Sequence, residues 1–203
     1  MPPSTPTSPN VRLTRESLLT LEGYAKARPE FRKRVIEHKK TRNVHLGEHV
    51  TLLFEDELTV RYQVQEMLRI ERIFEEQGIA HELETYRPLI PDGRNFKATM
   101  LLEYPEAELR KRELGKLIGI EDRTWVQAEG SEKVFAIADE DLERENDEKT
   151  SSVHFLRFEL SEEMAAALKY GVGLSIGIDH PNYRAELAPV PAAIRDALVR
   201  DLA

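Results

Sequence analysis

The sequence predicts an α+β fold: a mixed or mostly antiparallel sheet covered by helices, with one long core helix. β-rich runs and helical patterns follow one another without the regular alternation that builds a parallel sheet. A hairpin pattern in the second half of the chain is a direct antiparallel signal. Residues 58–77 combine helical spacing with many apolar side chains. At 203 residues the chain fits one domain, which we expect over residues 12–203.

The chain begins with a tail and two predicted helices. Residues 1–11 are rich in Pro, Ser and Thr and lack the basic and apolar regions of a signal peptide, which predicts a disordered tail on a cytoplasmic protein. Thr14 is expected to cap a helix that stops before Pro29, because proline removes a backbone donor from a helix interior. Pro29 then opens a second helix, which ends near Thr41.

The next predicted elements are a strand and the long helix. Residues 49–54 are β-rich and follow Gly47, so they predict a strand. The helix at 58–77 is expected to end at Gly78, which suits the left-handed position after a helix C-terminus. Residues 79–86 predict a further helical segment.

The second half of the chain contains several shorter elements. We expect a strand at 96–104, a helix at 105–117, a hairpin with arms at 124–129 and 133–138, a strand at 153–160, a helix capped by Ser161, a strand at 172–178 and a helix at 191–202. Residues 139–151 contain one apolar residue among thirteen, which predicts a mobile acidic loop.

Composition excludes several classes of protein. The net charge of −8 argues against a nucleic-acid-binding protein, which needs a basic surface to neutralise phosphates. No apolar run approaches the ~20 residues of a membrane span. The absence of cysteine excludes disulfides, thiol nucleophiles and cysteine-ligated zinc or iron–sulfur centres. No phosphate-binding loop or dinucleotide fingerprint is present, so we predict no bound cofactor.

The long helix carries polar residues within its apolar face. At 100° per residue, Gln63, Glu66 and Glu71 fall inside the arc that the apolar side chains occupy. An unpaired buried carboxylate costs several kcal/mol, so each should have a partner. Arg69 lies one helical turn from Glu66 and is expected to pair with it.

Three interpretations of these residues remain open. The leading one is a buried polar network that orients the helix, and the others are a substrate or anion pocket and a metal site. A metal site is disfavoured because the chain lacks the Glu-x-x-His motif of carboxylate-bridged di-iron bundles. His154, on an apolar strand face, is more often a satisfied core residue than a ligand. The candidate residues are Gln63, Glu66, Arg69, Glu71, His154 and Arg157.

Residues Gly173 to Gly177 match the Gly-x-Ser-x-Gly pattern of a nucleophile elbow. The flanking residues alternate like a continuous strand, whereas an elbow needs a sharp turn that exposes Ser175, so a serine hydrolase is disfavoured. The bare strand face that these residues share is expected to accept a packed helix.

Four segments resemble an uncharacterised bacterial domain family whose function is not assigned. They are HKKTRNVHLGEHVTLLFEDELTVRYQVQEMLRIERIFE, PLIPDGRNFKATMLLEYP, HFLRFEL and IGIDHPNY. From their typical gene surroundings, members of the family look like companions of two kinds of protein. These are rubrerythrin-like proteins and iron–sulfur proteins similar to heterodisulfide reductase subunits. The resemblance therefore implies an accessory or partner-binding protein in a cytoplasmic redox or oxidative-stress system. The alternative is a small-molecule-binding domain or metal-dependent enzyme with a carboxylate-lined pocket beside the 58–77 helix.

Overall fold

The computed structural model describes residues 13–138 and 149–203. The predicted tail at 1–11 and most of the predicted loop at 139–151 lie outside these residues. Within the described end of that loop, Thr150 is buried, so this part of the chain belongs to the folded core.

The described chain contains α-helices, single-turn 3-10 helices and strands. The α-helices are Leu21–Lys39 (α1), Glu57–Glu71 (α2), Glu76–Tyr86 (α3), Ala107–Lys116 (α4), Glu162–Lys169 (α5) and Ala192–Val199 (α6). The 3-10 turns are Arg15–Ser17, Arg87–Leu89 and Glu121–Arg123. The strands are Asn43–Leu46 (β1), Val50–Phe54 (β2), Asn95–Leu102 (β3), Thr124–Ala128 (β4), Val134–Phe135 (β5), Ile137–Ala138 (β6), Val153–Glu159 (β7), Leu174–His180 (β8) and Tyr183–Leu187 (β9).

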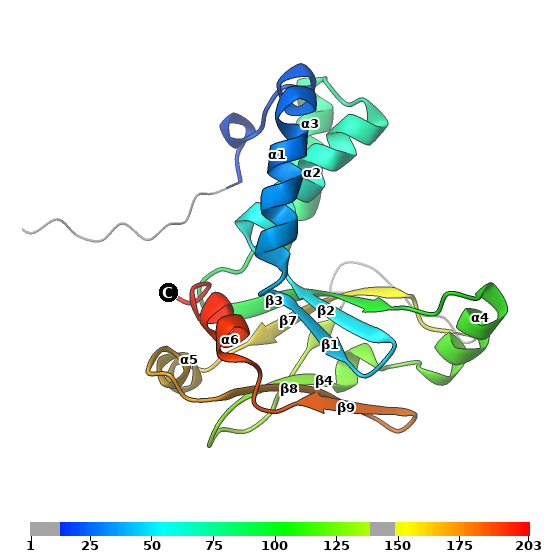
Figure 1. The fold of residues 1–203 in the computed structure, drawn as a ribbon, viewed down its shortest axis with the longest axis vertical. Coiled ribbons are helices and arrows are strands. Elements are labelled where there is room, and N and C mark those ends of the chain that lie inside the picture. The colour runs from blue at the N-terminus through cyan, green and yellow to red at the C-terminus, as the bar shows by residue number, and fades with distance from the viewer. Residues whose placement is uncertain (1–12, 139–148) are drawn as a thin grey trace, which may run out of the picture.

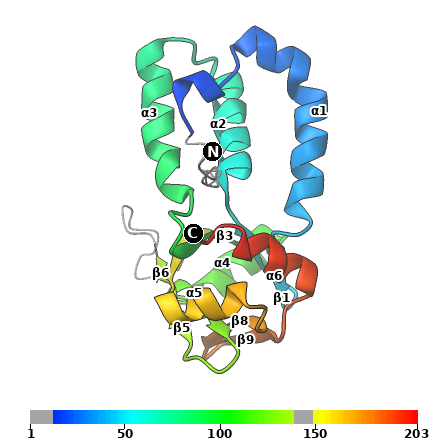
Figure 2. The same ribbon diagram turned by 90° about the vertical axis from the view of Figure 1, so that its left-hand side faces the viewer.

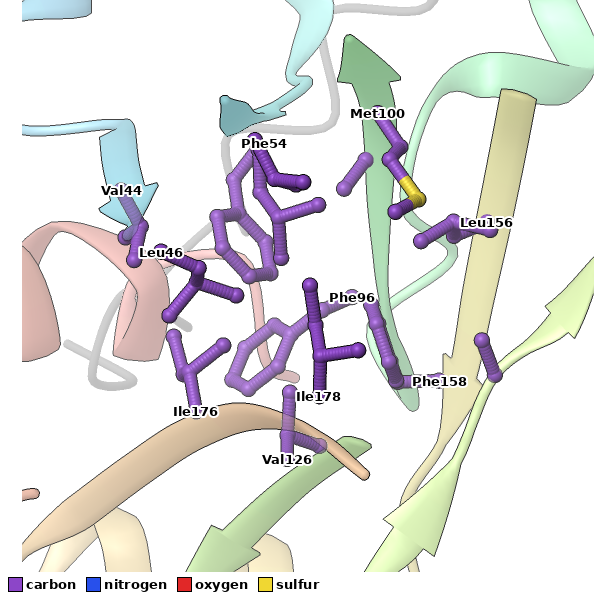
Figure 3. Packing of buried hydrophobic residues seen from close by; sticks show 14 of the residues in the cluster. Val44, Leu46, Phe54, Phe96, Met100, Val126, Leu156, Phe158, Ile176 and Ile178 are labelled. Carbon is purple, nitrogen blue, oxygen red and sulfur yellow. The ribbon is translucent and has the colours of Figure 1, made fainter. Parts of the chain in front are cut away.

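The strands form two antiparallel sheets, which confirms the predicted α+β class. One sheet has the order β1-β2-β3-β7-β6 and the other β5-β4-β8-β9. The two sheets share one hydrophobic core (Figure 3). Residues at its centre are Phe54, Phe96 and Phe158 from the first sheet and Val126, Ile176 and Ile178 from the second. A second sheet therefore covers the inner face of the five-stranded sheet.

Helices α1, α2 and α3 stand together beyond the five-stranded sheet (Figure 1, Figure 2). α2 packs against both α1 and α3. They have a smaller hydrophobic core of their own, with Val60, Val64 and Leu68 of α2 among its members. These three residues are spaced four apart, so they lie on one face of α2.

The predicted break at Pro29 is wrong, because α1 runs through this residue. A proline inside a helix leaves the carbonyl four residues earlier without its donor. Here Pro29 and Ala25 are both exposed, so water can satisfy that carbonyl. The helix begins later than predicted, with Thr20 as its N-cap accepting from Gly23 N at 3.1 Å. Thr14 caps only a 3-10 turn.

The predicted end of the long helix is also wrong. α2 ends at Glu71, and the following residue, Arg72, takes the left-handed conformation with φ of 56°. Gly78 lies within α3 instead of terminating α2. An arginine in this position gives no sequence signal, because glycine is the residue that usually fills it.

The sheets contain two strands that the sequence patterns do not predict and one that pairs differently from the prediction. β1 and β9 are short and have no strong β pattern. The predicted hairpin is present, with Trp125 opposite Phe135 and Val126 opposite Val134. Its second arm, however, is divided between the sheets, because β6 pairs with β7.

Candidate functional site

A pocket of about 230 Å³ lies where α1, α2 and α3 meet the outer face of the five-stranded sheet. Its polar lining consists of Lys39, Glu55, Thr59, Gln63 and Thr99. Its apolar lining consists of Leu53, Val60, Tyr86, Leu89, Val153 and Phe155. The pocket therefore combines one carboxylate and one lysine ammonium with hydroxyl, amide and apolar walls.

Strand alternation places these side chains on one face of the sheet. In β2 and the residue after it, Phe54 faces the inner core, whereas Leu53 and Glu55 face outward. Leu53 lies directly opposite Thr99, which in turn lies opposite Phe155. The floor of the pocket is thus a continuous row across three strands.

Glu55 is the buried carboxylate of the pocket, with 9% of its surface exposed. Its Oε1 accepts a hydrogen bond from the Thr99 hydroxyl at 2.7 Å, and its Oε2 accepts one from the Thr59 hydroxyl. No Lys, Arg or His of residues 13–138 or 149–203 forms an ion pair with it. A carboxylate has about four acceptor sites, so Glu55 keeps acceptor capacity for another donor.

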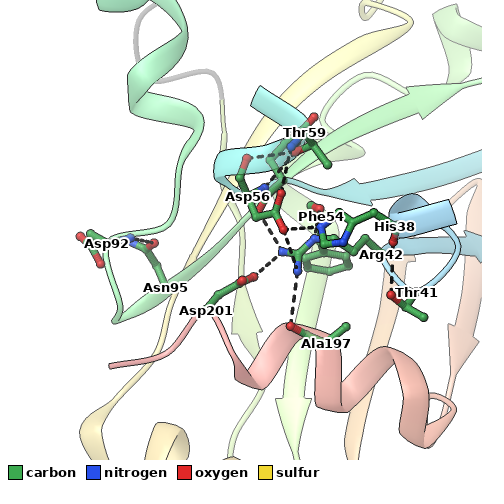
Figure 4. A network of polar contacts seen from close by, with 11 residues as sticks. His38, Thr41, Arg42, Phe54, Asp56, Thr59, Asp92, Asn95, Ala197 and Asp201 are labelled. Atoms are coloured by element: carbon green, nitrogen blue, oxygen red, sulfur yellow. Dashed lines mark hydrogen bonds and ion pairs between the residues drawn. The ribbon is translucent and has the colours of Figure 1, made fainter. Parts of the chain in front are cut away.

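The backbone on either side of Glu55 is held by the sheet and by Arg42. The Glu55 N–H donates to the carbonyl of Lys97 at 2.8 Å, which extends the β2–β3 pairing by one residue. Arg42 is 2% exposed and donates to three backbone carbonyls and one carboxylate (Figure 4). These acceptors are Phe54 O at 2.8 Å, Glu55 O at 3.0 Å, Ala197 O at 3.3 Å and the Asp201 carboxylate.

Asp56 continues this buried network into α2 (Figure 4). Its Oδ1 accepts from Thr59 N at 2.9 Å as the helix N-cap, and its Oδ2 lies 2.5 Å from His38 Nε2. Burial alone raises the pKa of Asp56, but the His38 hydrogen bond and the charge of Arg42 outweigh it and hold the pKa at about 2. Burial raises the pKa of Asp201 to about 6, although Arg42 lowers it. The network joins α1, α2 and α6 beside the pocket.

Glu66 lies in a separate polar network between α1 and α2. Arg28 donates to both of its carboxylate oxygens, at 2.7 and 2.9 Å, and the Tyr24 hydroxyl donates at 2.7 Å. The predicted pair with Arg69 is confirmed at 3.1 Å. The hydrogen bond from Arg28, with those from Tyr24 and Arg69, lowers the pKa of Glu66 to about 2. Glu66 is not among the residues that line the pocket.

Comparisons with known proteins show the family. A family described as "Protein of unknown function (DUF3501)" matches residues 12–202. The chain belongs to this family. It is also similar to a novel protein of unknown function from Burkholderia pseudomallei K96243, whose crystal structure matches with a TM-score of 0.90 at 53% sequence identity. That match covers 95% of this chain and 100% of the other. No curated protein matches.

The family resemblance predicted from the sequence is therefore confirmed. Neither the family description nor that of the crystal structure assigns a role. Among the helices of the described residues, none has both the length and the apolar character of a membrane span.

The inward orientation predicted for Gln63 and Glu71 is wrong, because both side chains are exposed. At 100° per residue, Ile70 and Phe74 belong to the apolar arc of this helix, yet they are 60% and 69% exposed. A helical angle gives only the direction of a side chain, whereas burial depends on where the neighbouring helices lie. Gln63 nevertheless lines the pocket from its exposed side of α2.

His154 and Arg157 lie on opposite faces of β7. His154 is fully buried, and its Nε2 lies 2.8 Å from Thr150 Oγ1 and 3.7 Å from Glu121 Oε2. It is thus the satisfied core histidine that the sequence favours. Arg157 pairs with Glu159 at 2.6 Å on the outer face. The structure does not bring the six candidate residues together.

The residues at the centre of the pocket are not among those that the sequence predicts. Glu55 lies one residue beyond the predicted strand at 49–54, although strand alternation extended by one residue places it on the face of Leu53. Neither Thr59 nor Thr99 belongs to a motif. Thr59 follows Glu55 closely in the sequence, whereas Thr99 becomes its neighbour only through the sheet. Within the described residues, no group of three His, Asp or Glu side chains is arranged to hold a metal ion.

The Gly-x-Ser-x-Gly pattern lies within β8, which continues from Leu174 to His180 without a turn. A methyl group added at Gly177 would meet Trp125 Cζ2 at 2.4 Å. The expectation that a helix packs on this face is therefore wrong at Gly177, because the indole of the neighbouring strand covers it.

Proposed function

We propose that the protein binds a small organic molecule with a positively charged group, such as an amine, in the pocket around Glu55. The observation that carries the proposal is a carboxylate that is 9% exposed and has hydroxyl partners but no cationic partner in the described structure. Burying a charge without a counter-charge is costly. A ligand ammonium would offset this cost and use the remaining acceptor capacity of the carboxylate.

The walls of the pocket limit the ligand further. A volume of about 230 Å³ suits a metabolite of few heavy atoms, since drug-sized ligands occupy pockets of roughly 300–1,000 Å³. Tyr86, Leu89 and Phe155 offer contact to a short apolar or aromatic body. The amide of Gln63 supplies one donor and one acceptor group for orientation.

Calorimetry tests this proposal with a panel of small primary amines, each compared with its neutral alcohol isostere. At least one amine should bind the wild type, and Glu55→Gln should weaken it by about tenfold or more, equivalent to ~1.4 kcal/mol. Glu71→Gln makes the same charge change at an exposed position outside the pocket and should leave binding unchanged. Equal binding of amine and alcohol, or no effect of Glu55→Gln, would contradict the proposal.

A metal-dependent activity in this pocket is the alternative form of the proposal. Its support is limited to the Glu55 carboxylate, because the other polar lining residues are hydroxyl, amide and ammonium groups, which are weaker or unsuitable ligands. Elemental analysis of protein purified without chelator, before and after addition of iron, manganese or zinc, distinguishes the two. Stoichiometric metal that is lost in Glu55→Gln would favour the metal site.

We further propose that the protein acts as an accessory or partner-binding protein in a cytoplasmic redox or oxidative-stress system. The support is the family resemblance, together with a sequence that has no cysteine for a thiol or cluster centre of its own. The partners would be rubrerythrin-like and iron–sulfur proteins, which would carry the redox centres. Co-purification with proteins encoded beside it, and peroxide sensitivity of a deletion strain, test the idea. No association and unchanged sensitivity would count against it.

A further inference from the structure

A second and larger pocket, of about 490 Å³, lies beside α4. Its polar lining consists of the cationic side chains of Arg110, Lys111 and Lys149 and the hydroxyl-bearing residues Thr150, Ser151 and Ser152. No carboxylate occurs among the described lining residues. In a chain with a net charge of −8, this concentration of positive charge is a local feature.

The charges of α4 are divided between two sides of the helix. Arg112 and Lys116 both form ion pairs with Glu113, at 3.1 and 3.0 Å. Arg110 is half-buried and donates a 3.5 Å hydrogen bond to the carbonyl of Pro105. Neither Arg110 nor Lys111 forms an ion pair within the described residues. The two cations that α4 contributes to the pocket, Arg110 and Lys111, are thus available for an anionic ligand.

The hydroxyl side of the pocket is held by the core. Thr150 is 1% exposed, its N–H donates to Leu114 O at 3.3 Å, and its Oγ1 lies 2.8 Å from His154 Nε2. Ser151 Oγ accepts from Val153 N at 3.1 Å, which leaves its hydroxyl hydrogen for another acceptor. Positioned donors opposite long cationic side chains are a common way to bind an oxyanion.

We propose that this pocket binds a small metabolite through its oxyanion group, which is a phosphate or a carboxylate. The ligand carries more than one negative charge. Arginine holds such groups through paired N–H donors, and lysine adds a point charge. The net negative charge of the protein repels anions at long range, so binding depends on these short contacts. The proposal is independent of the Glu55 pocket, because the two pockets have no lining residue in common.

Calorimetry at low ionic strength, with inorganic pyrophosphate and citrate as probes, tests the proposal. The double variant Arg110→Gln with Lys111→Gln should weaken binding at least about tenfold, as expected for lost charge-assisted hydrogen bonds. The matched control, Arg112→Gln with Lys116→Gln, removes the same charge from the paired side of α4 and should change binding less than about twofold. Ser152→Asp adds a carboxylate to the pocket wall without altering the helix, and should also abolish binding.

The outcomes separate the possible ligands and decide the proposal. Binding of both probes indicates recognition of oxyanion charge, and binding of pyrophosphate alone indicates phosphate. No binding of either probe to the wild type overturns the proposal. Equal weakening in the Arg110 and Arg112 double variants also overturns it, since the effect would then be unspecific charge attraction. If the Arg110 double variant does not fold, the Ser152→Asp result decides.

Discussion

Replacing Glu66 by glutamine tests whether the network between α1 and α2 stabilises the fold. The substitution keeps the shape of the side chain and removes its charge. Glu66 is only 13% exposed in its side chain and accepts hydrogen bonds from Arg28, Tyr24 and Arg69. We expect the variant to fold with a lower free energy of unfolding.

The size of the loss in unfolding free energy follows from the hydrogen bonds that Glu66 loses in the variant. The bidentate pair with Arg28, at 2.7 and 2.9 Å, becomes at most a single neutral hydrogen bond. A hydrogen bond to a charged group contributes about 1.5–3 kcal/mol. The side chains of Arg28 and Arg69 are 34% and 38% exposed, so water replaces part of what they lose. We therefore expect a loss of about 2 kcal/mol in the free energy of unfolding.

The effect should depend on pH in a defined direction. The pKa of Glu66 is lowered from 4.5 to about 2 in the folded state, mainly by the Arg28 hydrogen bond. Between these values the unfolded chain binds the proton and the folded chain does not, so folding is disfavoured as pH falls. The difference between wild type and Glu66→Gln should be complete above pH 4.5 and shrink toward pH 2.

Urea denaturation at neutral and acidic pH measures this difference, with Glu71→Gln as the control on the same helix. Glu71 is exposed, so its variant should change the free energy of unfolding by less than about 0.5 kcal/mol. A double-mutant cycle with Arg28→Gln should give a coupling energy of at least ~0.5 kcal/mol. Equal effects of Glu66→Gln and Glu71→Gln, or no coupling with Arg28, would refute the reasoning.

Two further predictions concern the buried network and the strand β8. The pKa of Asp201 is raised from 3.8 to about 6 by burial, so its contribution to stability is present below pH 3.8 and lost as pH rises through 6. Asp201→Asn should therefore flatten the fall in unfolding free energy over this window, and an unchanged slope in urea titrations at several pH values would contradict this. Gly177→Ala should cost about 1–3 kcal/mol, because its new methyl group meets Trp125 at 2.4 Å. Ser175→Ala is its control, and the fluorescence of Trp125, the single tryptophan, should shift only in the Gly177 variant.

Local patterns were sufficient to locate most elements. The strands β2, β3 and β7 lie where β-rich runs predict them, and Ser161 caps α5 by accepting from Met164 N at 3.2 Å. These elements depend on alternation and capping within a few residues, which the sequence displays directly. The predicted helix break at Pro29 and the predicted end of the long helix are wrong because tertiary contacts or solvent override a local preference there.

The candidate site was less predictable than the fold. Glu66 was recognised as a carboxylate that needed a partner, and Arg69 was a correct partner because it lies on the same helix. Its bidentate partner, Arg28, belongs to another helix, and no periodicity within α2 identifies it. No sequence pattern marks Glu55, because acidic residues between a strand and a helix are typical of a turn.

By itself, the sequence determined the α+β class, the main strands and helices, the core position of His154 and the family, because each depends on local pattern or on long similar segments. Only the tertiary structure decided how the strands divide into two sheets and which side chains meet. Arg42 reaches Asp201 across 159 residues of sequence, and Glu55 meets Thr99 across 44. Such pairings follow from how whole elements pack, and packing depends on all the faces that must be buried together.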